Sequence, residues 1–386
     1  LAEDEHVLAL TQHHIATDAW SIDLLLREIA TLYPAFHAGE APALEAPRVR
    51  YADYAAWQRS WLASGEGRRQ LAYWMAQLGA DGEPAALPLD RPRPARRDHA
   101  GGRVDLVLPD LVTARLRRVA DAERTTMSVV LLAAFSALLR RHGAQEELRI
   151  GVPMTGRNRV ETEAVVGLFV NTVVVSARVS APVGFTALVR QVRDTMLAAQ
   201  AHQDVPFDQL VEALQPDRSL GQHPLFQVMF NHLQQGGLAI GAFGGLRVEL
   251  VERVLRAQIF DLALTTQERS GGISASLGFA EDVLDRATVE RLGERFLRLL
   301  AQVGEQPERL LSDHALLLPG EMSRVEAGAA GAASLEGLLG LAGSAPAVVC
   351  GDTVVSRAAL LAGAGRLAAR PRAAGVGPET VVAVAL

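Results

Sequence analysis

The sequence of 386 residues contains no lysine, so all 38 of its basic residues are arginine. This absence excludes a Schiff-base lysine and a phosphate-binding lysine of the Walker type anywhere in this chain. The 44 acidic residues give a formal net charge of −6. Such a balance does not indicate a surface for nucleic acid, and we expect no nucleic-acid partner.

Cysteine and long apolar runs are scarce as well. Cys350 is the single cysteine, which excludes a disulfide within the chain and a cysteine-based zinc cluster. It precedes Gly351 and Asp352, a pair typical of a turn, so we interpret Cys350 as structural. There is neither a signal-peptide pattern nor a run of about twenty apolar residues. We therefore expect a cytoplasmic protein with no membrane partner.

The composition, 49% hydrophobic and 21% charged residues, suits a folded protein, and the length predicts two or three domains or lobes. The chain begins at Leu1, close to an apolar strand at 7–10, and it stops at Leu386 in a strand-like run. We interpret this as a fragment of a longer protein.

Strand and helix patterns alternate along the chain, which predicts an α/β sandwich. Ser21 is expected to cap the first helix, and Pro109 with Asp110 is expected to open another. The predicted helices cover 21–36, 51–78, 125–142, 185–202, 206–214 and 287–303. The predicted strands cover 1–12, 104–108, 148–153, 165–179, 227–231, 247–251 and 273–279.

Two stretches have the composition of connections. Residues 84–94 predict an exposed, extended linker that attaches Leu87 and Leu89 to the surface. Glycine, alanine and serine dominate 327–345, as in a flexible interdomain linker. The sequence after it again has folded α/β character.

His13, His14 and Asp18 form the main candidate site. Adjacent side chains at a strand end point to opposite sides, so one imidazole is expected to face a cavity while the other packs inward. The facing imidazole can accept or deliver a proton. Asp18 can pair with an arginine or fix a ring tautomer. These three residues also fit a purely structural role, and their diverging side chains argue against a metal site.

The surrounding sequence resembles the condensation domains of non-ribosomal peptide synthetases, in the chloramphenicol-acetyltransferase-like superfamily. Five stretches resemble family motifs in the same order, and the resemblance covers about residues 1–312. They are 13–21 (HHIATDAWS, similar to HHxxxDGxS), 51–57 (YADYAAW, YxDYAxW), 166–172 (VGLFVNT, xGxFVNT), 202–208 (HQDVPFD, HQDxPFE) and 217–226 (DRSLGQHPLF, RDxSxxPLF).

The resemblance implies a fold of two lobes arranged in a V, with the active-site histidine between them. Carrier proteins bring phosphopantetheine arms to this histidine from opposite sides. The expected partners are an upstream donor and a downstream acceptor peptidyl carrier protein, and no cofactor is bound by the domain itself. The early motifs of the first lobe, including an RHExLR segment, are absent, which implies an incomplete N-lobe.

The same resemblance suggests four regions. The remainder of the N-lobe would occupy 1–100, the C-lobe 101–312 and an interdomain linker 313–346. Residues 347–386 resemble the start of an adjacent adenylation domain, in stretches 348–352 (VVCGD) and 366–379, although its TYxEL motif has become SRAAL at 356–360. No ATP-binding residues are present in this piece.

The resemblance assigns His14 to the active site, as a general base or as a group that holds the attacking amine. His13 and Asp18 are the other candidate catalytic residues, and we expect Asp18 to brace the loop rather than to act as a base. Arg157 is the expected partner of Asp18. Trp20, Ser21, Arg157 and Asn171 are expected to line the substrate channel or to serve the structure. Ala19 stands where the family usually has glycine; if that position needs a positive φ, alanine costs about 1 kcal/mol.

Trp20 before Ser21 and the intact histidine pair favour an ordinary amide-forming condensation domain over epimerising or heterocyclising relatives. Three alternatives stay open. The chain could be an inactive scaffold that docks carrier proteins, or an ester-forming relative in which an alcohol replaces the amine. His13 and Asp18 also satisfy the HxxxxD pattern of glycerolipid acyltransferases, but the sequence has neither the membrane anchor nor the basic phosphate pocket expected there.

Overall fold

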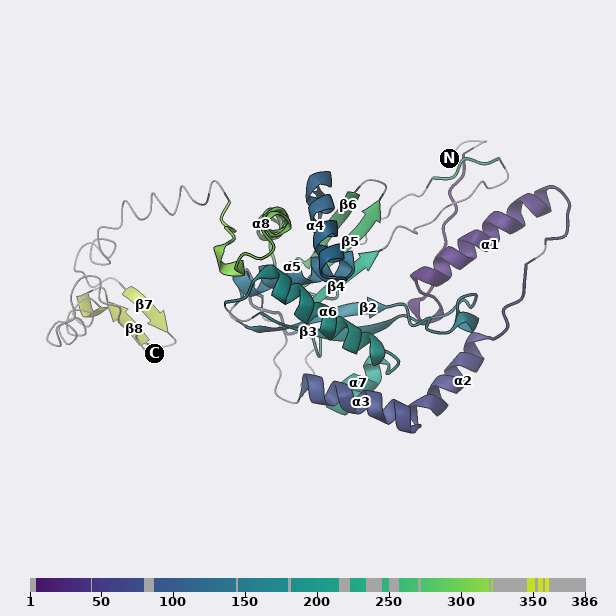
Figure 1. The fold of residues 1–386 in the computed structure, drawn as a ribbon, viewed down its shortest axis with the longest axis horizontal. Coiled ribbons are helices and arrows are strands. Elements are labelled where there is room, and N and C mark those ends of the chain that lie inside the picture. Colours follow the sequence, from purple (N-terminus) through teal and green to yellow (C-terminus); the bar gives the residue numbers. More distant parts are fainter. Residues whose placement is uncertain are drawn as a thin grey trace. The chain divides into compact units, whose positions relative to one another are not determined.

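The chain divides into two units, Leu1–Leu316 and Leu317–Leu386. The computed structural model describes residues 5–42, 44–79, 87–143, 145–179, 182–214, 223–233, 245–249, 257–269, 272–318, 321, 346–350, 353–356 and 358–360. Within these residues the first unit holds a six-stranded sheet with helices, and the second holds a two-stranded sheet (Figure 1).

The six strands form one mixed sheet in the order β1-β6-β5-β4-β2-β3. β4 runs parallel to β2 and to β5, whereas the other neighbours are antiparallel. Met154 at the end of β2 lies opposite Asn171 at the start of β3, so residues 155–170 form a long loop at one end of the sheet. The strands are β1 (Gly101–Leu108), β2 (Glu147–Met154), β3 (Asn171–Arg178), β4 (Val228–Leu233), β5 (Leu262–Arg269) and β6 (Gly272–Ala280).

Both faces of β2 are covered. Ile150 and Val152 alternate with Arg149 and Gly151, and all four residues are buried. Since successive strand residues point to opposite faces, neither face of β2 is open to solvent. Arg149 donates a hydrogen bond to the carbonyl of Leu78, the last residue of α3 (Gly65–Leu78), and so attaches this helix to the sheet.

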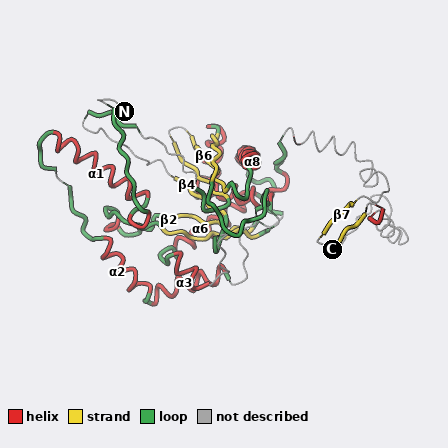
Figure 2. Tube along the Cα trace, turned by 180° about the vertical axis from the view of Figure 1, so that it is seen from behind, coloured by secondary structure: helices red, strands yellow, loops and turns green. Residues whose placement is uncertain are grey.

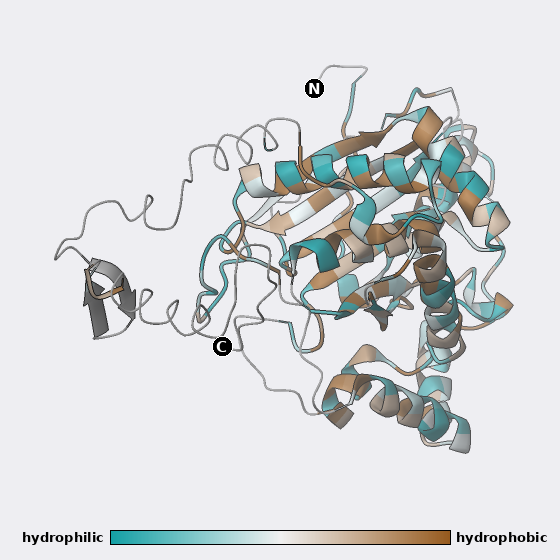
Figure 3. Ribbon diagram, turned by 60° about the vertical axis from the view of Figure 1, so that its left-hand side comes forward, coloured by the Kyte–Doolittle hydropathy of each residue, from teal (hydrophilic) through white to brown (hydrophobic). Residues whose placement is uncertain are grey.

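α5 (Met127–His142) is the central helix, with 12 of its 16 residues buried. A helix that is apolar on all sides belongs inside a core, whereas one that lies at the surface shows a single apolar stripe. Bands of hydrophobic and hydrophilic residues alternate along the outer helices (Figure 3). These outer helices are α4 (Asp110–Ala122), α6 (Phe185–Ala201) and α8 (Arg286–Glu305).

Three helices before the sheet, α1 (Ala19–His37), α2 (Tyr51–Leu62) and α3, follow one another along one side of the first unit (Figure 2). α3 buries four residues, but α1 buries only Ser21 and α2 buries none. α1 is therefore attached to the rest of the first unit chiefly at its N-terminus. The remaining elements here are α7 (Phe207–Leu214), η1 (His14–Ala16), η2 (Val160–Thr162) and η3 (Leu311–Asp313).

Most of the predicted elements are confirmed. Pro109 precedes α4, and Leu87 and Leu89 pack against the core as expected. The predicted helical region 51–78 is divided into α2 and α3. The confirmed helices are those predicted at 21–36, 51–78, 125–142, 185–202, 206–214 and 287–303, and the confirmed strands are those at 104–108, 148–153, 227–231 and 273–279.

Two of the predicted strands, 1–12 and 165–179, are not confirmed over their predicted length. Residues 6–13 have no regular structure, and Val7 and Leu8 are exposed, because no described strand pairs with this apolar run. The predicted strand 165–179 is confirmed only from Asn171 onward. The backbone of residues 167–169 instead bonds to the side chains of distant residues, as described below.

Other differences concern a cap and a missed strand. Asp18, and not Ser21, is the N-cap of α1, because its carboxylate accepts the Ser21 N–H. β5 was not predicted; its inward residues are Leu262, Leu264 and Thr266, a weaker apolar pattern than in its neighbours. Residues 247–249 are not a strand, while 250–251 and 217–222 lie outside the described residues.

The second unit is described only in part. β7 (Pro346–Cys350) pairs in antiparallel fashion with β8 (Thr353–Ser356), and Cys350 lies opposite Thr353. The chain therefore reverses between these two residues, where a turn was expected. Gly351, Asp352 and most of the predicted linker and adenylation-like tail lie outside the described residues.

Each helix in the described part of the chain is too short or too polar to span a bilayer by itself. α4 and α5 together have the length and apolar composition of a membrane span, but their axes are bent by 106° relative to each other.

Replacing Trp74 by phenylalanine is expected to lower the free energy of unfolding by about 1–3 kcal/mol. The Trp74 indole is buried, and its Nε1–H donates to the carbonyl of His202 at 2.7 Å. In the variant this buried carbonyl would lose its hydrogen-bond donor. Urea titration of both proteins measures the difference. Trp61→Phe is the control, since this half-buried indole makes no hydrogen bond within the described residues. Equal losses in the two variants would contradict the assignment.

Candidate active site

His13 and His14 lie on a single 3-10 turn just before α1. The Ala16 N–H donates to the His13 carbonyl at 3.0 Å, and the Thr17 N–H donates to the His14 carbonyl at 3.3 Å. Asp18 then caps α1. The local sequence explains this arrangement, because an aspartate before a helix accepts a backbone N–H that would otherwise lack a partner.

The His14 ring has a defined tautomer when it is neutral. Its Nδ1 lies 2.7 Å from the carbonyl oxygen of Thr17. A carbonyl oxygen only accepts, so Nδ1 must carry the proton. The lone pair then resides on Nε2, and His14 is exposed. This nitrogen can therefore accept a proton from a group that approaches from solvent.

The His13 ring has the opposite tautomer. Its Nδ1 accepts the N–H of Ile15 at 3.1 Å, so in the neutral ring the proton is on Nε2. His13 is also exposed, and the prediction that one imidazole packs inward is wrong. The expected alternation applies to an extended strand end, whereas these residues belong to a 3-10 turn. Of the two rings, only that of His14 keeps a basic nitrogen without an intramolecular donor among the described residues.

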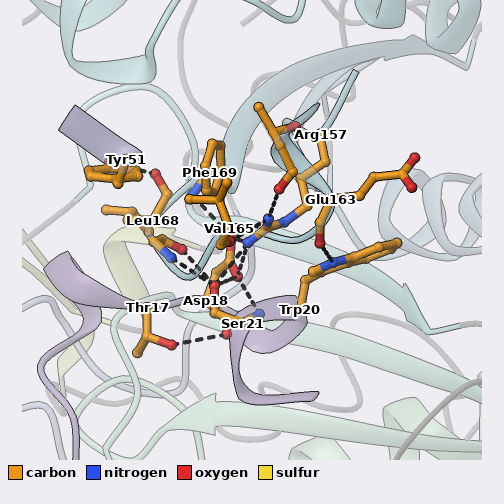
Figure 4. A network of polar contacts seen from close by, with 12 residues as sticks. Thr17, Asp18, Trp20, Ser21, Tyr51, Arg157, Glu163, Val165, Leu168 and Phe169 are labelled. Carbon is orange, nitrogen blue, oxygen red and sulfur yellow. Dashed lines mark hydrogen bonds and ion pairs between the residues drawn. The ribbon is translucent and has the colours of Figure 1, made fainter. Parts of the chain in front are cut away.

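Asp18 is buried and its carboxylate is fully engaged (Figure 4). Oδ1 accepts the Ser21 N–H at 2.8 Å, and Oδ2 accepts the Phe169 N–H at 3.0 Å. The Arg157 guanidinium lies 3.1 Å from Oδ1, and both side chains of this ion pair are almost completely buried. The predicted pairing of Asp18 with Arg157 is thus present. Asp18 joins the histidine turn to a loop about 140 residues further along the chain.

Arg157 is held on several sides. Its Nη1 donates to the carbonyl of Val165 at 2.8 Å and also to that of Thr162. The guanidinium stacks over the Phe169 ring at 4.2 Å from the centroid. The preceding Gly156 has a φ of +65°, and a Cβ there would lie 1.9 Å from the Phe169 carbonyl oxygen. Glycine at 156 therefore permits the approach of the Arg157 loop.

The environment keeps Asp18 ionised. Burial acts to raise the pKa of the Asp18 carboxyl, but hydrogen bonds from Ser21 and Phe169 and the charge of Arg157 outweigh it. The pKa of this carboxyl therefore lies below its usual value. Neither imidazole bonds to Asp18, and the bonds of its carboxylate go to the N-terminus of α1 and to the loop that contains Arg157 and Phe169.

Ser21 and Trp20 complete this connection. The buried Ser21 hydroxyl lies 2.7 Å from Asp18 Oδ1 and 2.8 Å from the Gly167 carbonyl, and it donates its one proton to one of them at a time. It accepts from Arg157 at 2.9 Å. The Trp20 Nε1–H donates to the carbonyl of Glu163 at 2.9 Å, and the residue as a whole is 40% exposed. Ser21 is thus enclosed, while Trp20 remains partly exposed.

The family model of the condensation domain matches residues 1–325 of this chain. The chain belongs to the condensation-domain family. It is 41% identical over 310 residues to one of the linear gramicidin synthase proteins of Brevibacillus parabrevis, which is 80% of this chain and 4% of that protein. It is 39% identical over 397 residues to CymA, a probable nonribosomal peptide synthetase of Salinispora arenicola, which is 99% of this chain and 5% of that protein. It is thus homologous to condensation domains of nonribosomal peptide synthetases.

Solved structures show the same fold. The X-domain from teicoplanin biosynthesis is 31% identical with a TM-score of 0.74, over 79% of this chain and 70% of that one. The first condensation domain of the calcium-dependent antibiotic synthetase, in complex with a substrate analogue, is 24% identical with a TM-score of 0.65, over 79% and 66%. The chain spans only 4–10% of the length of the curated relatives it matches.

Ala19 is compatible with this condensation-domain turn. It is the first residue of α1, and the described non-glycine residues with positive φ are His99 and Arg124. The backbone strain considered for alanine at this position is therefore absent.

Asn171 serves the structure of the condensation domain. Its amide Nδ2 donates to the carbonyls of Gln203 and Val205 at 2.8 and 2.7 Å. Its Oδ1 accepts the N–H groups of Thr172 and Phe207, each at 3.0 Å. With both ends of the amide occupied, Asn171 holds the turn before α7 and has no group left for a substrate.

Sequence reasoning did not assign Tyr51 to the site. Its hydroxyl donates to the carbonyl of Leu168 at 2.8 Å, within the segment that Asp18 and Ser21 also bind. The sequence signal for Tyr51 was its position in the YADYAAW motif, but this motif does not indicate which residue the hydroxyl bonds to. Among the described residues, no group of three histidine, cysteine, aspartate or glutamate side chains could hold a metal ion.

Proposed function

We propose that this condensation domain joins a donor acyl or peptidyl thioester to the amine of an acceptor aminoacyl thioester. The observation that carries this proposal is the bond between His14 Nδ1 and the Thr17 carbonyl, which leaves the Nε2 lone pair available on an exposed residue. A nitrogen nucleophile needs such a group, either to remove its proton or to hold its lone pair towards the carbonyl.

The chemistry follows from the reactants. The neutral amine attacks the thioester carbonyl, a carbon–nitrogen bond forms, and the carbon–sulfur bond breaks. The proton lost by nitrogen is returned to the leaving thiolate. The outward Nε2 of His14 can accept this proton or hydrogen-bond the amine, whereas His13 presents an N–H and cannot accept it.

The proposed substrates are carried on phosphopantetheine arms of an upstream donor and a downstream acceptor carrier protein. Both arms would approach the exposed turn at His14. The domain then needs no bound cofactor of its own, because the thioester is already activated.

The proposed division of the chain is an incomplete N-lobe over 1–100, a C-lobe over 101–312, a linker over 313–346 and the start of an adenylation domain over 347–386. The similarity to CymA supports the last region, since it covers 99% of the chain and includes most of this tail. An adenylation domain would accordingly be the neighbouring partner.

The test uses the intact synthetase module with donor and acceptor carrier proteins loaded with aminoacyl thioesters. Formation of a carrier-bound dipeptide, measured by mass spectrometry, is the expected result. Binding of both loaded carriers without any dipeptide would contradict the proposal. A hydroxyacyl acceptor tested beside the aminoacyl one separates amide formation from ester formation.

Docking without catalysis is the second candidate function. The X-domain from teicoplanin biosynthesis has also been solved in complex with OxyB, and this structure is 32% identical to the present chain with a TM-score of 0.73. A relative with this fold therefore binds another protein. The outcome of binding without a product in the same assay would favour this function.

A further inference from the structure

The segment 167–169 connects three parts of the first unit that are distant in sequence. The Gly167 N–H donates to the Ser21 hydroxyl at 3.0 Å, and the Phe169 N–H donates to Asp18 at 3.0 Å. The carbonyl between these groups, that of Leu168, accepts from the Tyr51 hydroxyl at 2.8 Å. α2 and the N-terminus of α1 thus bind the same three residues of the long loop.

The Tyr51 ring fits tightly against this segment. A Cβ added to Gly167 would lie 2.1 Å from the Tyr51 ring, so only glycine permits this approach. The ring also meets Phe169 edge-on, with centroids 5.2 Å apart. Tyr51 therefore fixes the segment through a hydrogen bond to Leu168 and through ring contacts on either side of it.

The Tyr51 hydroxyl is suited to donate this bond. Burial and the negative charge of Asp18 raise the pKa of the Tyr51 phenol above its usual value. The phenol therefore keeps its proton, and the Leu168 carbonyl has a donor throughout the neutral range.

The position of His14 depends strongly on this segment. Ser21 is the one buried residue of α1, so the rest of this helix does little to fix the histidine turn in place. The contacts that fix the turn are those of Asp18 and Ser21 with 167–169 and Arg157, together with the bond from Trp20 to Glu163. A displacement of Leu168 would shift Asp18 and, through the short turn before it, the His14 imidazole.

We propose that Tyr51 is a positioning residue for His14, acting through Leu168 and Asp18. This inference rests on the proposed function of His14 in amide formation. Tyr51 touches no reacting atom. It holds the loop segment to which the histidine turn is attached, and a small displacement of a base from its attack geometry lowers a rate without changing the binding of substrate.

The test is Tyr51→Phe in the intact synthetase module, with kcat and KM measured for dipeptide formation. The variant keeps the ring and loses one hydrogen bond, so we expect kcat to fall by about three- to tenfold with KM for the acceptor carrier unchanged. Tyr54→Phe is the matched control. Its ring also packs on Phe169, with centroids 4.7 Å apart, but among the residues that the structure describes its hydroxyl bonds only to Gln58 of the same helix, from which it accepts at 3.3 Å. This control should keep the kcat of the parent.

A double variant distinguishes positioning from a general structural effect. In the His14→Ala background, Tyr51→Phe should lower the residual rate no further, because the group that it positions is gone. A reduction of the same size in both backgrounds, or no reduction in the parent, overturns the inference. If His14→Ala itself leaves kcat unchanged, the proposed function fails instead, so the two failures are separate results.

Discussion

Replacing His14 by alanine is expected to lower dipeptide formation in the intact module by at least about a hundredfold. The variant removes the outward Nε2, the one basic nitrogen that the histidine turn presents to solvent. Binding of the carrier proteins to the domain should be unchanged, because it does not require a proton acceptor at position 14. Single-turnover assays with both carriers loaded measure the rate without product release.

His13→Ala is the matched control for this prediction. Both rings are exposed and lie on the same turn, but His13 uses its Nδ1 lone pair for the Ile15 N–H. Its loss should act mainly on folding, and therefore on the amount of active protein rather than on the rate per active molecule. Equal losses of stability and activity in the two variants would count against the assignment of His14.

The tautomers show where sequence reasoning ends. The sequence indicates that two histidines precede a capping aspartate, and the resemblance favours the second. It does not show that residues 14–16 form a 3-10 turn, nor that Thr17 offers a carbonyl to one ring while Ile15 offers an N–H to the other. These are properties of backbone direction, which side-chain periodicity does not record.

The loop 155–170 shows a second limit. Its β-branched and apolar residues predicted a strand from 165, because a strand is the usual way to satisfy the backbone groups of such a run. Here the backbone at 167–169 bonds to the side chains of Asp18, Ser21 and Tyr51, which are more than a hundred residues away in sequence. Only the pairing of Asp18 with Arg157 was anticipated, from the polar loop that follows strand 148–153 and from the family resemblance.

The helices were predicted more successfully because their signals are local. Pro109 before α4 and Gly143 after the end of α5 are adjacent to the elements they delimit. The apolar run in α5 is long enough to be a helix and too apolar to lie on a surface. The sequence 262–269 had no comparable local signal, and it forms the strand β5 mainly because its backbone pairs with β4 on one side and β6 on the other.

Replacing Asp18 by alanine is expected to lower the free energy of unfolding by about 3–5 kcal/mol. The change leaves the Arg157 guanidinium buried without its counter-charge, and the N–H groups of Ser21 and Phe169 lose their acceptor. Because the same contacts hold the histidine turn, activity should fall together with stability. Denaturant titration measures the first effect, and the dipeptide assay measures the second.

The control for Asp18→Ala is Asp105→Ala. Asp105 also pairs with an arginine, Arg103 at 2.6 Å, but both side chains are largely exposed. An exposed pair contributes about 0–1 kcal/mol, so this variant should remain close to the parent. A loss from Asp18→Ala no greater than that from Asp105→Ala would show that the buried pair does not brace the fold.

The Asp18 carboxyl also gives the stability a pH dependence of defined sign. Its pKa is lowered in the folded chain, so the unfolded chain binds the proton more readily. The contribution of Asp18 is therefore complete above the ordinary pKa of an aspartate, about 4, and is lost as the pH falls through the lower folded-state value. Asp18→Asn should reduce the slope of stability against pH in this acidic window and leave the slope between about pH 5 and 8 unchanged. An unchanged acidic slope in that variant would mean that other carboxylates account for the acid sensitivity of the domain.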